Sequence, residues 1–428
     1  MKKHFSASLF VAVTLGLAWA LRGHFGHEWG ASWAGAAGVL ALLLVSGRRD
    51  WARRAPVVAA LGAVGWGAGG MMSYGMIVGY CRSLSFPDAL YGYAMLSVVG
   101  GLYGFAGGGL PALALETDEK KRPDWARLMA EMVAGALLAW GLLIYQMEWF
   151  MTPPRSELWA AMLGASAALA WYLARNGYRR ALRVAAYSAL GAAFGFSFGN
   201  FLQTLGTASG IPYNWWNVME FTLGFFGGLG MAWAVLTRDW PESPAPTRTG
   251  HLLATVFVFL FIPFANFANS MSAEKFLDRA RQFHLEVNPL FGCRQMWVAA
   301  ALLVLFAAVF FSLWLRRSVD RSKALAATPF LVLLEYNLFA WLVLLTFVRP
   351  FRLSRSEALY PFVLLLLGAW WWWGLRRTPA QPADDGRRES GLRWTLLLLL
   401  WAAAMAALAL ISVNSHGPLP GAQERFTL

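Results

Sequence analysis

The sequence predicts an all-α polytopic membrane protein of about thirteen transmembrane helices, the first eight arranged as four tandem helix hairpins. Hydrophobic residues make up 58% of the 428 residues and charged residues only 14%, which is too apolar for a water-soluble core. Long apolar runs alternate with short polar connections along the chain. Lys and Arg gather in every second connection, as they do in the cytoplasmic loops of membrane proteins.

Runs of roughly 20 mostly apolar residues define the predicted spans, because a helix of that length crosses the hydrocarbon core. The second and seventh runs are rich in Gly and Ala, and the flanking charges still fit two crossings. The predicted spans are residues 5–23, 29–46, 55–80, 89–115, 127–147, 157–174, 184–205, 215–237, 251–271, 295–315, 324–347, 359–375 and 394–413. Residues 2–20 are expected to remain as the first span rather than to be cleaved as a signal sequence.

The basic clusters orient these spans. About 25 of the 36 Lys and Arg residues fall on one side, which the positive-inside rule assigns to the cytoplasm. The clusters are residues 2–3, 48–54, 120–122, 175–183, 316–323 and 376–388. We therefore expect an inner-membrane protein with a cytoplasmic N-terminus and a periplasmic C-terminus. The net charge of +13 then reports topology, and no nucleic-acid partner is predicted.

An internal repeat relates the first eight spans. A small or polar residue, an aromatic residue and a glycine recur at residues 24–26, 73–75 and 197–199. In addition, Glu28, Ser97, Glu157 and Glu220 are each followed, seven and ten residues later, by Gly or Ala. These anchors lie about 60 to 70 residues apart, and the third copy is degenerate. Small residues on one helix face predict close helix packing in the membrane.

The chain is predicted to divide into two halves. Residues 1–240 form the Gly-rich bundle of repeated hairpins, and residues 250–428 form a second membrane half of about five helices. Residues 241–249 contain three prolines and are a natural boundary. Residues 272–292, on the outer side, are expected to include an interfacial helix.

The densest polar cluster is Arg22, His24, His27 and Glu28, at the outer turn between the first two spans. An Arg, two imidazoles and a carboxylate can bind an anionic group or move protons. We assign His24, His27 and Glu28 as candidate catalytic residues and Arg22 as a substrate-binding residue. His24 and His27 are three residues apart, but the motif is too short for us to assign a metal, and no cofactor is assigned.

Glu220 is the fourth candidate catalytic residue, because other polar and aromatic residues lie near the same outer end. Amides beside Trp faces suit a hydroxyl-bearing ligand such as a sugar headgroup, although a Trp pair also suits the membrane interface. A carboxylate near the start of a helix is in addition favoured by the helix dipole. The candidate substrate-binding residues of this group are Asn200, Gln203, Asn214, Trp215 and Trp216.

Glu335 lies near the middle of the eleventh predicted span, where an ionisable residue is costly. It is either a substrate- or ion-binding residue or a protonated group bonded within the bundle. Cys81 and Cys293 both fall on the outer side, where they are either disulfide-bonded or unpaired.

Two functions follow from these residues, and the first is preferred because transporters are the commoner class among multi-span membrane proteins of this size. A transporter or permease for a small polar or lipid-like solute is favoured by the duplicated hairpins and by Glu335. A membrane-embedded transferase or hydrolase, acting on a lipid or glycan at the periplasmic face, is favoured by the polar residues gathered on one side. The span count is similar to that of membrane-type lipid-dependent glycosyltransferases, but the first outer loop is short and carries one carboxylate, so no residue role is carried over. Membrane lipids are expected partners in either case.

Overall fold

The computed structural model describes residues 2–350, 352, 355–377, 379–384 and 390–426, and every regular element within them is helical. Eleven of these helices are long and apolar enough to cross a membrane. The predicted class, an all-helical chain with many candidate membrane spans, is therefore confirmed. Arg387 and Arg388, which end the last predicted basic cluster, lie outside the described residues.

The first half of the chain contains helices α1 to α9. They are α1 (Lys2–Arg22), α2 (Glu28–Ser46), α3 (Arg49–Gly70), α4 (Gly75–Tyr80), α5 (Phe86–Leu115), α6 (Trp125–Trp140) continued by a π-helical turn (Gly141–Gln146), α7 (Leu158–Arg175), α8 (Arg179–Ala208) and α9 (Trp215–Leu236). Two predicted spans, 55–80 and 157–174, are helical but are not among the eleven. The first of them is interrupted at residues 71–74, between α3 and α4. The count of thirteen therefore stays a prediction.

Six of these helices form a closed ring. In the order α1, α2, α3, α5, α8 and α9, each helix packs against the next, and α9 packs back against α1. Helices α6 and α7 pack against each other outside this ring, with α7 against α5 and α8. Helix α6 is mostly exposed, as expected of a lipid-facing helix. The pair that lies outside the ring comes from the third, degenerate copy of the repeat.

The repeated glycines lie where ring helices approach most closely. A methyl group added at Gly35 would lie 2.6 Å from the carbonyl oxygen of Gly62 on α3. One added at Gly104 would meet the carbonyl of Ser188 on α8, and one added at Gly227 would lie 2.7 Å from the Trp66 ring. Since hydrophobic drive is absent between helices in lipid, such close approach supplies dispersion contacts instead.

The second half of the chain contains helices α10 to α16. They are α10 (Arg248–Val256), a π-helical turn (Phe257–Phe261), α11 (Ile262–Ser270), α12 (Ala273–Gln282), α13 (Leu290–Leu315), α14 (Arg321–Val343), α15 (Ser356–Trp373) and α16 (Gly391–Ser415). Helix α14 packs against α2 and α3, and α16 packs against α5 and α8. Helix α12 lies in the predicted interfacial segment and buries Phe276 and Ala280.

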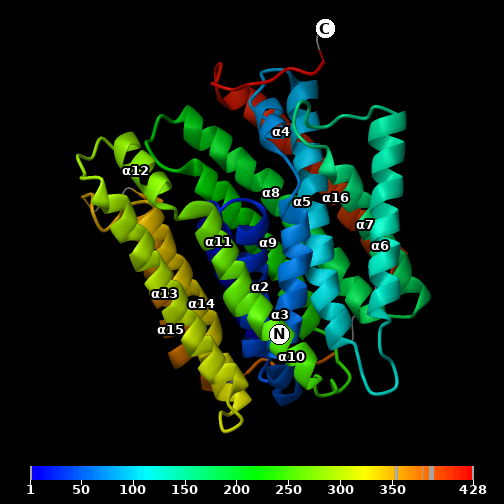
Figure 1. The fold of residues 1–428 in the computed structure, drawn as a ribbon. Helices are drawn as coiled ribbons and strands as arrows, with labels where there is room; N and C mark the ends of the chain where they lie inside the picture. Colours follow the sequence, from blue (N-terminus) through cyan, green and yellow to red (C-terminus); the bar gives the residue numbers. More distant parts are fainter. Residues whose placement is uncertain (1, 351, 353–354, 378, 385–389, 427–428) are drawn as a thin grey trace.

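The two termini lie at opposite ends of the bundle (Figure 1). At the N-terminal end, the segment after α15 is fastened to the first half, because the amide of Ala380 donates to the carbonyl of Val45. Cys81 is buried and Cys293 is exposed, and both are free thiols, so the structure contains no bond between them.

Candidate functional site

A buried ion pair joins the first and last helices of the ring. Arg22 is the last residue of α1, and its Nη2 lies 2.5 Å from Oε2 of Glu220 on α9. Their side chains are 0% and 1% exposed. The Arg22 guanidinium also lies 4.9 Å from the centre of the Trp19 ring. A cation at a helix C-terminus, over a Trp face and against a carboxylate is favourable on three counts.

Glu220 lies in the second turn of α9, which begins at Trp215. The helix dipole acts on the first turn, so it does not explain this carboxylate. Its hydrogen bonds do. Glu220 accepts from Arg22, from the Tyr74 hydroxyl at 2.8 Å and from Trp216 Nε1 at 3.1 Å. Three donors therefore satisfy the oxygens of this buried carboxylate.

Tyr74 and His27 extend this group from the ion pair outward. Arg22 Nη2 donates to the Tyr74 hydroxyl at 3.4 Å, and Arg22 Nη1 lies 3.1 Å from His27 Nδ1. The His27 ring packs edge-on against Tyr74, which in turn stacks on Trp216. Tyr74 was not predicted as a site residue from the sequence, although it is the aromatic residue of the repeated triplet. We call Arg22, His27, Tyr74, Trp216 and Glu220 the outer polar cluster.

The hydrogen bond from Arg22 fixes the tautomer of His27. A guanidinium can only donate, so Nδ1 of His27 accepts, and the ring proton of neutral His27 is on Nε2. Burial and the positive charge of Arg22 both lower the pKa of His27. The ring is therefore neutral at neutral pH and offers an N–H hydrogen-bond donor, as an electrophilic catalyst would.

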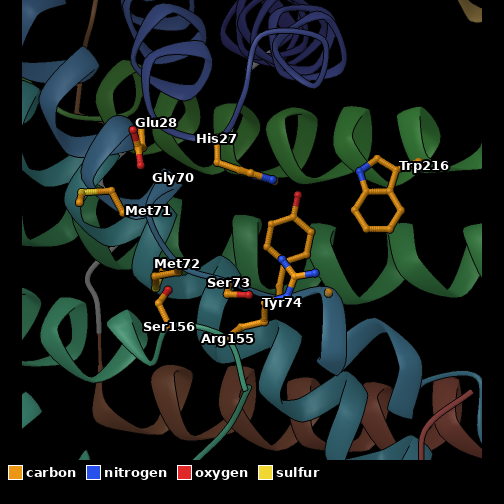
Figure 2. Close-up of a pocket in the computed structure, with 11 residues that line it drawn as sticks. His27, Glu28, Gly70, Met71, Met72, Ser73, Tyr74, Arg155, Ser156 and Trp216 are labelled. Carbon is orange, nitrogen blue, oxygen red and sulfur yellow. The ribbon is translucent and has the colours of Figure 1, made fainter. Parts of the chain in front are cut away.

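The outer polar cluster borders a pocket of about 440 Å³. Figure 2 shows His27, Tyr74 and Trp216 converging on one side of it, with Glu28 and Met71 on another. Glu28 is exposed at its rim and has no hydrogen-bond partner among the described residues. The lining residues are His27, Glu28, Gly70, Met71, Met72, Ser73, Tyr74, Gly75, Arg155, Ser156 and Trp216.

The pocket thus holds a cation in Arg155, an acceptor in Glu28 and donors in His27 and Ser73. Neither Arg155 nor Ser73 was selected from the sequence. Ser73 does stand beside Tyr74 in the repeated triplet, and that triplet was the only available signal. The set can bind an anionic or hydroxyl-bearing group.

His24 lies apart from this pocket. Its Nε2 is 3.0 Å from the Tyr360 hydroxyl on α15, and its ring packs edge-on against Tyr360. Burial and the nearby Arg279 charge lower the pKa of His24 to about 4. Tyr360 is also hydrogen-bonded to Asn217 of α9. His24 therefore joins the ring to α15 instead of lining the pocket.

Four predicted residues of α8 and the start of α9 belong neither to the pocket lining nor to the outer polar cluster. Asn200 and Gln203 are buried on α8, where the Asn200 amide donates to Gln203 at 2.8 Å. Asn214 caps α9 by accepting from the Asn217 amide. Trp215 Nε1 donates to the carbonyl of residue 211 at 3.1 Å. Of the Trp pair, only Trp216 reaches the outer polar cluster.

Glu335 is fully buried on α14. Neither of its carboxylate oxygens has a hydrogen-bond partner among the described residues. The neighbouring Tyr336 and Asn337 each carry a buried oxygen that is likewise unpartnered within the described chain. Glu335 does not line the pocket that the outer polar cluster borders.

Within the described residues, no three His, Cys, Asp or Glu side chains are grouped as metal ligands. The candidate site is therefore the outer polar cluster together with the pocket that it borders. Comparison of the chain with known protein families, curated proteins and solved structures finds no match.

Proposed function

We propose that the protein is a membrane-embedded transferase or hydrolase that acts on a lipid or glycan substrate at the outer face of the inner membrane. The observation that carries this proposal is the outer polar cluster, in which a buried Arg22–Glu220 pair positions His27 beside an open polar pocket. Charged and hydrogen-bonding groups gathered in one pocket are typical of a catalytic site.

The cluster supplies distinct roles for its members. The buried ion pair of Glu220 and Arg22 is a rigid support, and Arg22 orients His27 by its hydrogen bond to Nδ1. His27 then donates a hydrogen bond from Nε2 to an oxygen of the substrate. Glu28 accepts the proton of the attacking hydroxyl or water as the new bond forms, and it returns this proton to the leaving group as the old bond breaks. Arg155 binds an anionic group of the substrate, such as a phosphate.

The proposed topology places this pocket in the periplasm. The chain crosses the membrane thirteen times, as four hairpins and five further spans, with a cytoplasmic N-terminus and a periplasmic C-terminus. The alternation of basic clusters supports this orientation. Termini at opposite ends of the bundle are what an odd number of crossings requires.

Transport of a small polar or lipid-like solute is the second candidate function, and Glu335 is the observation that favours it. A fully buried carboxylate without a partner among the described residues is a costly feature, and in transporters such groups bind coupling ions or protons. Either function involves membrane lipids and a small-molecule or lipid substrate, with no nucleic acid.

One complementation experiment separates the two candidates. Cells without the chromosomal gene are complemented with the wild-type chain or with His27→Ala, Glu28→Gln or Glu335→Gln, and their lipids and periplasmic glycans are profiled by mass spectrometry. For an enzyme, a species that accumulates in the null strain is consumed by the wild type and by Glu335→Gln, but not by His27→Ala.

His24→Ala is the matched control, because His24 belongs to the same turn but lies outside the pocket. Its profile should match the wild type. If His27→Ala and Glu28→Gln both restore the wild-type profile while Glu335→Gln does not, the enzyme proposal fails and transport is supported.

A further inference from the structure

An apolar groove runs along the outer surface of α14 and α15. It encloses about 670 Å³, and its lining residues are on helices outside the ring and do not belong to the outer polar cluster. The lining residues recur every three to four positions along each helix, so one face of each helix lines the groove. These residues include Ala327, Phe330 and Leu334 on α14, and Leu364, Gly368 and Trp372 on α15.

The groove continues into a second cavity of about 530 Å³, which ends at two cations. Lys323 is in the first turn of α14, and Arg376 follows the end of α15. Both are exposed, and neither has an ion-pair or hydrogen-bond partner among the described residues. Arg376 lies 4.3 Å from the centre of the Trp372 ring, which orients its guanidinium at the groove.

The length of the groove matches one leaflet of a bilayer. Residues 322–334 of α14 and 364–376 of α15 each rise by roughly 18 Å, at 1.5 Å per residue. Half of a hydrocarbon core is about 15 Å thick. Cations at one end and apolar walls over the remaining length therefore complement an acyl chain with a negatively charged headgroup.

We propose that this groove is a binding site for an anionic glycerophospholipid of the leaflet at the N-terminal end of the bundle. The headgroup phosphate lies between Lys323 and Arg376, and an acyl chain lies against Phe330 and Gly368. A second copy of the chain is a poorer occupant. If two copies packed groove to groove about a two-fold axis along the membrane normal, Lys323 and Arg376 of both copies would lie close together. These four like charges would have no compensating anion.

Gly368 gives a direct test of occupancy. A methyl group added there would meet no protein atom within 4 Å, so a larger side chain enters the groove without displacing the helix. Gly368→Phe therefore fills the acyl-chain position, and Lys323→Gln with Arg376→Gln removes the headgroup partners. Lys323 and Arg376 are exposed and Gly368 is partly exposed, so none of these changes is made in the buried core.

Native mass spectrometry of the purified, delipidated full chain then measures the binding of dioleoyl phosphatidylglycerol and dioleoyl phosphatidylcholine. The wild type should bind the anionic lipid about tenfold more tightly than the zwitterionic one. The double Gln variant should lose this preference, and Gly368→Phe should weaken binding of both lipids by about tenfold.

Two controls match these variants. Gly141→Phe adds the same ring at another glycine with open space around it, and Arg316→Gln with Arg317→Gln removes two cations at the same end of the bundle. Both should bind lipid as the wild type does. The proposal is wrong if the wild type binds the two lipids equally, or if Gly368→Phe binds like Gly141→Phe. A change from dimer to monomer in Gly368→Phe, with lipid binding unchanged, would show instead that a second copy occupies the groove.

Discussion

Arg22 and Glu220 hold two opposite charges in the interior of an apolar bundle, and each charge is tolerated because the other is present. Removal of one partner leaves an uncompensated buried charge, which costs about 3 to 5 kcal/mol. Arg22→Met should therefore lower the free energy of unfolding in detergent by about that amount. Arg22→Met combined with Glu220→Met should be less destabilised than the sum of the single variants.

Glu119→Gln is the control for this prediction. Glu119 pairs with Arg122 on the surface, where both side chains are mostly exposed, so its loss should cost about 0 to 1 kcal/mol. Additive losses in the Arg22 and Glu220 double variant would contradict the description of a coupled pair.

The sequence placed Arg22, His27, Trp216 and Glu220 at one end of the molecule, and the structure brings these four together. The sequence could not predict that His27 lines the pocket while His24 lies apart from it. That separation depends on the turn between them, where Gly26 has a φ of +95° and the chain reverses. Tyr74 was missed because its approach to Glu220 depends on the break between α3 and α4, which hydropathy does not reveal.

His24 should make the protein sensitive to acid. Its folded pKa of about 4 lies below the ordinary value of 6.5, so protonation favours the unfolded chain. The stabilisation is complete above pH 6.5 and is lost as the pH falls from 6.5 towards 4. The drop in Tm between pH 7.5 and pH 5 should become smaller in His24→Gln. His284→Gln, at an exposed histidine, should retain the full drop.

At the scale of helices, close packing within the ring depends on which face a glycine occupies. Gly104 of α5 faces the backbone of α8, whereas Gly101, one turn away, has its nearest neighbour atom on α8 at 3.7 Å from an added methyl. Gly104→Ala should therefore destabilise the protein by about 1 to 3 kcal/mol through overpacking. Gly101→Ala should be neutral or slightly stabilising, because Ala is the better helix former.

Thermal unfolding of both Gly variants in the same detergent measures this difference. Equal melting temperatures would contradict the close α5–α8 contact. The repeat spacing predicted that Gly104 lies on a packed face, since offsets of seven place residues on one side of a helix. It could not predict that α8 is the partner, because periodicity defines a face and not the helix that covers it.

The whole molecule is predicted to have its N-terminus in the cytoplasm, and a membrane-impermeant maleimide tests this. In a Cys81→Ser chain, the exposed Cys293 should be labelled in intact cells, because it precedes the tenth predicted span on the outer side. In a chain with both cysteines changed to Ser, Glu119→Cys should be labelled only after the membrane is permeabilised. The reverse pattern would invert the topology and place the pocket in the cytoplasm.

Labelling with the membrane-impermeant maleimide also tests whether α7 crosses the membrane. The predicted count of thirteen spans partly depends on that crossing. Helix α7 packs along α6, itself a candidate span, so its two ends should lie on opposite sides. In the cysteine-free chain, Arg155→Cys should react in intact cells and Asn176→Cys only after permeabilisation. Both positions are exposed, so access to the reagent depends on the membrane alone. Reaction of both from the outside would remove α7 from the spans. Termini at opposite ends of the bundle require an odd number of crossings. If α7 is not a span, one further predicted span must therefore also be absent.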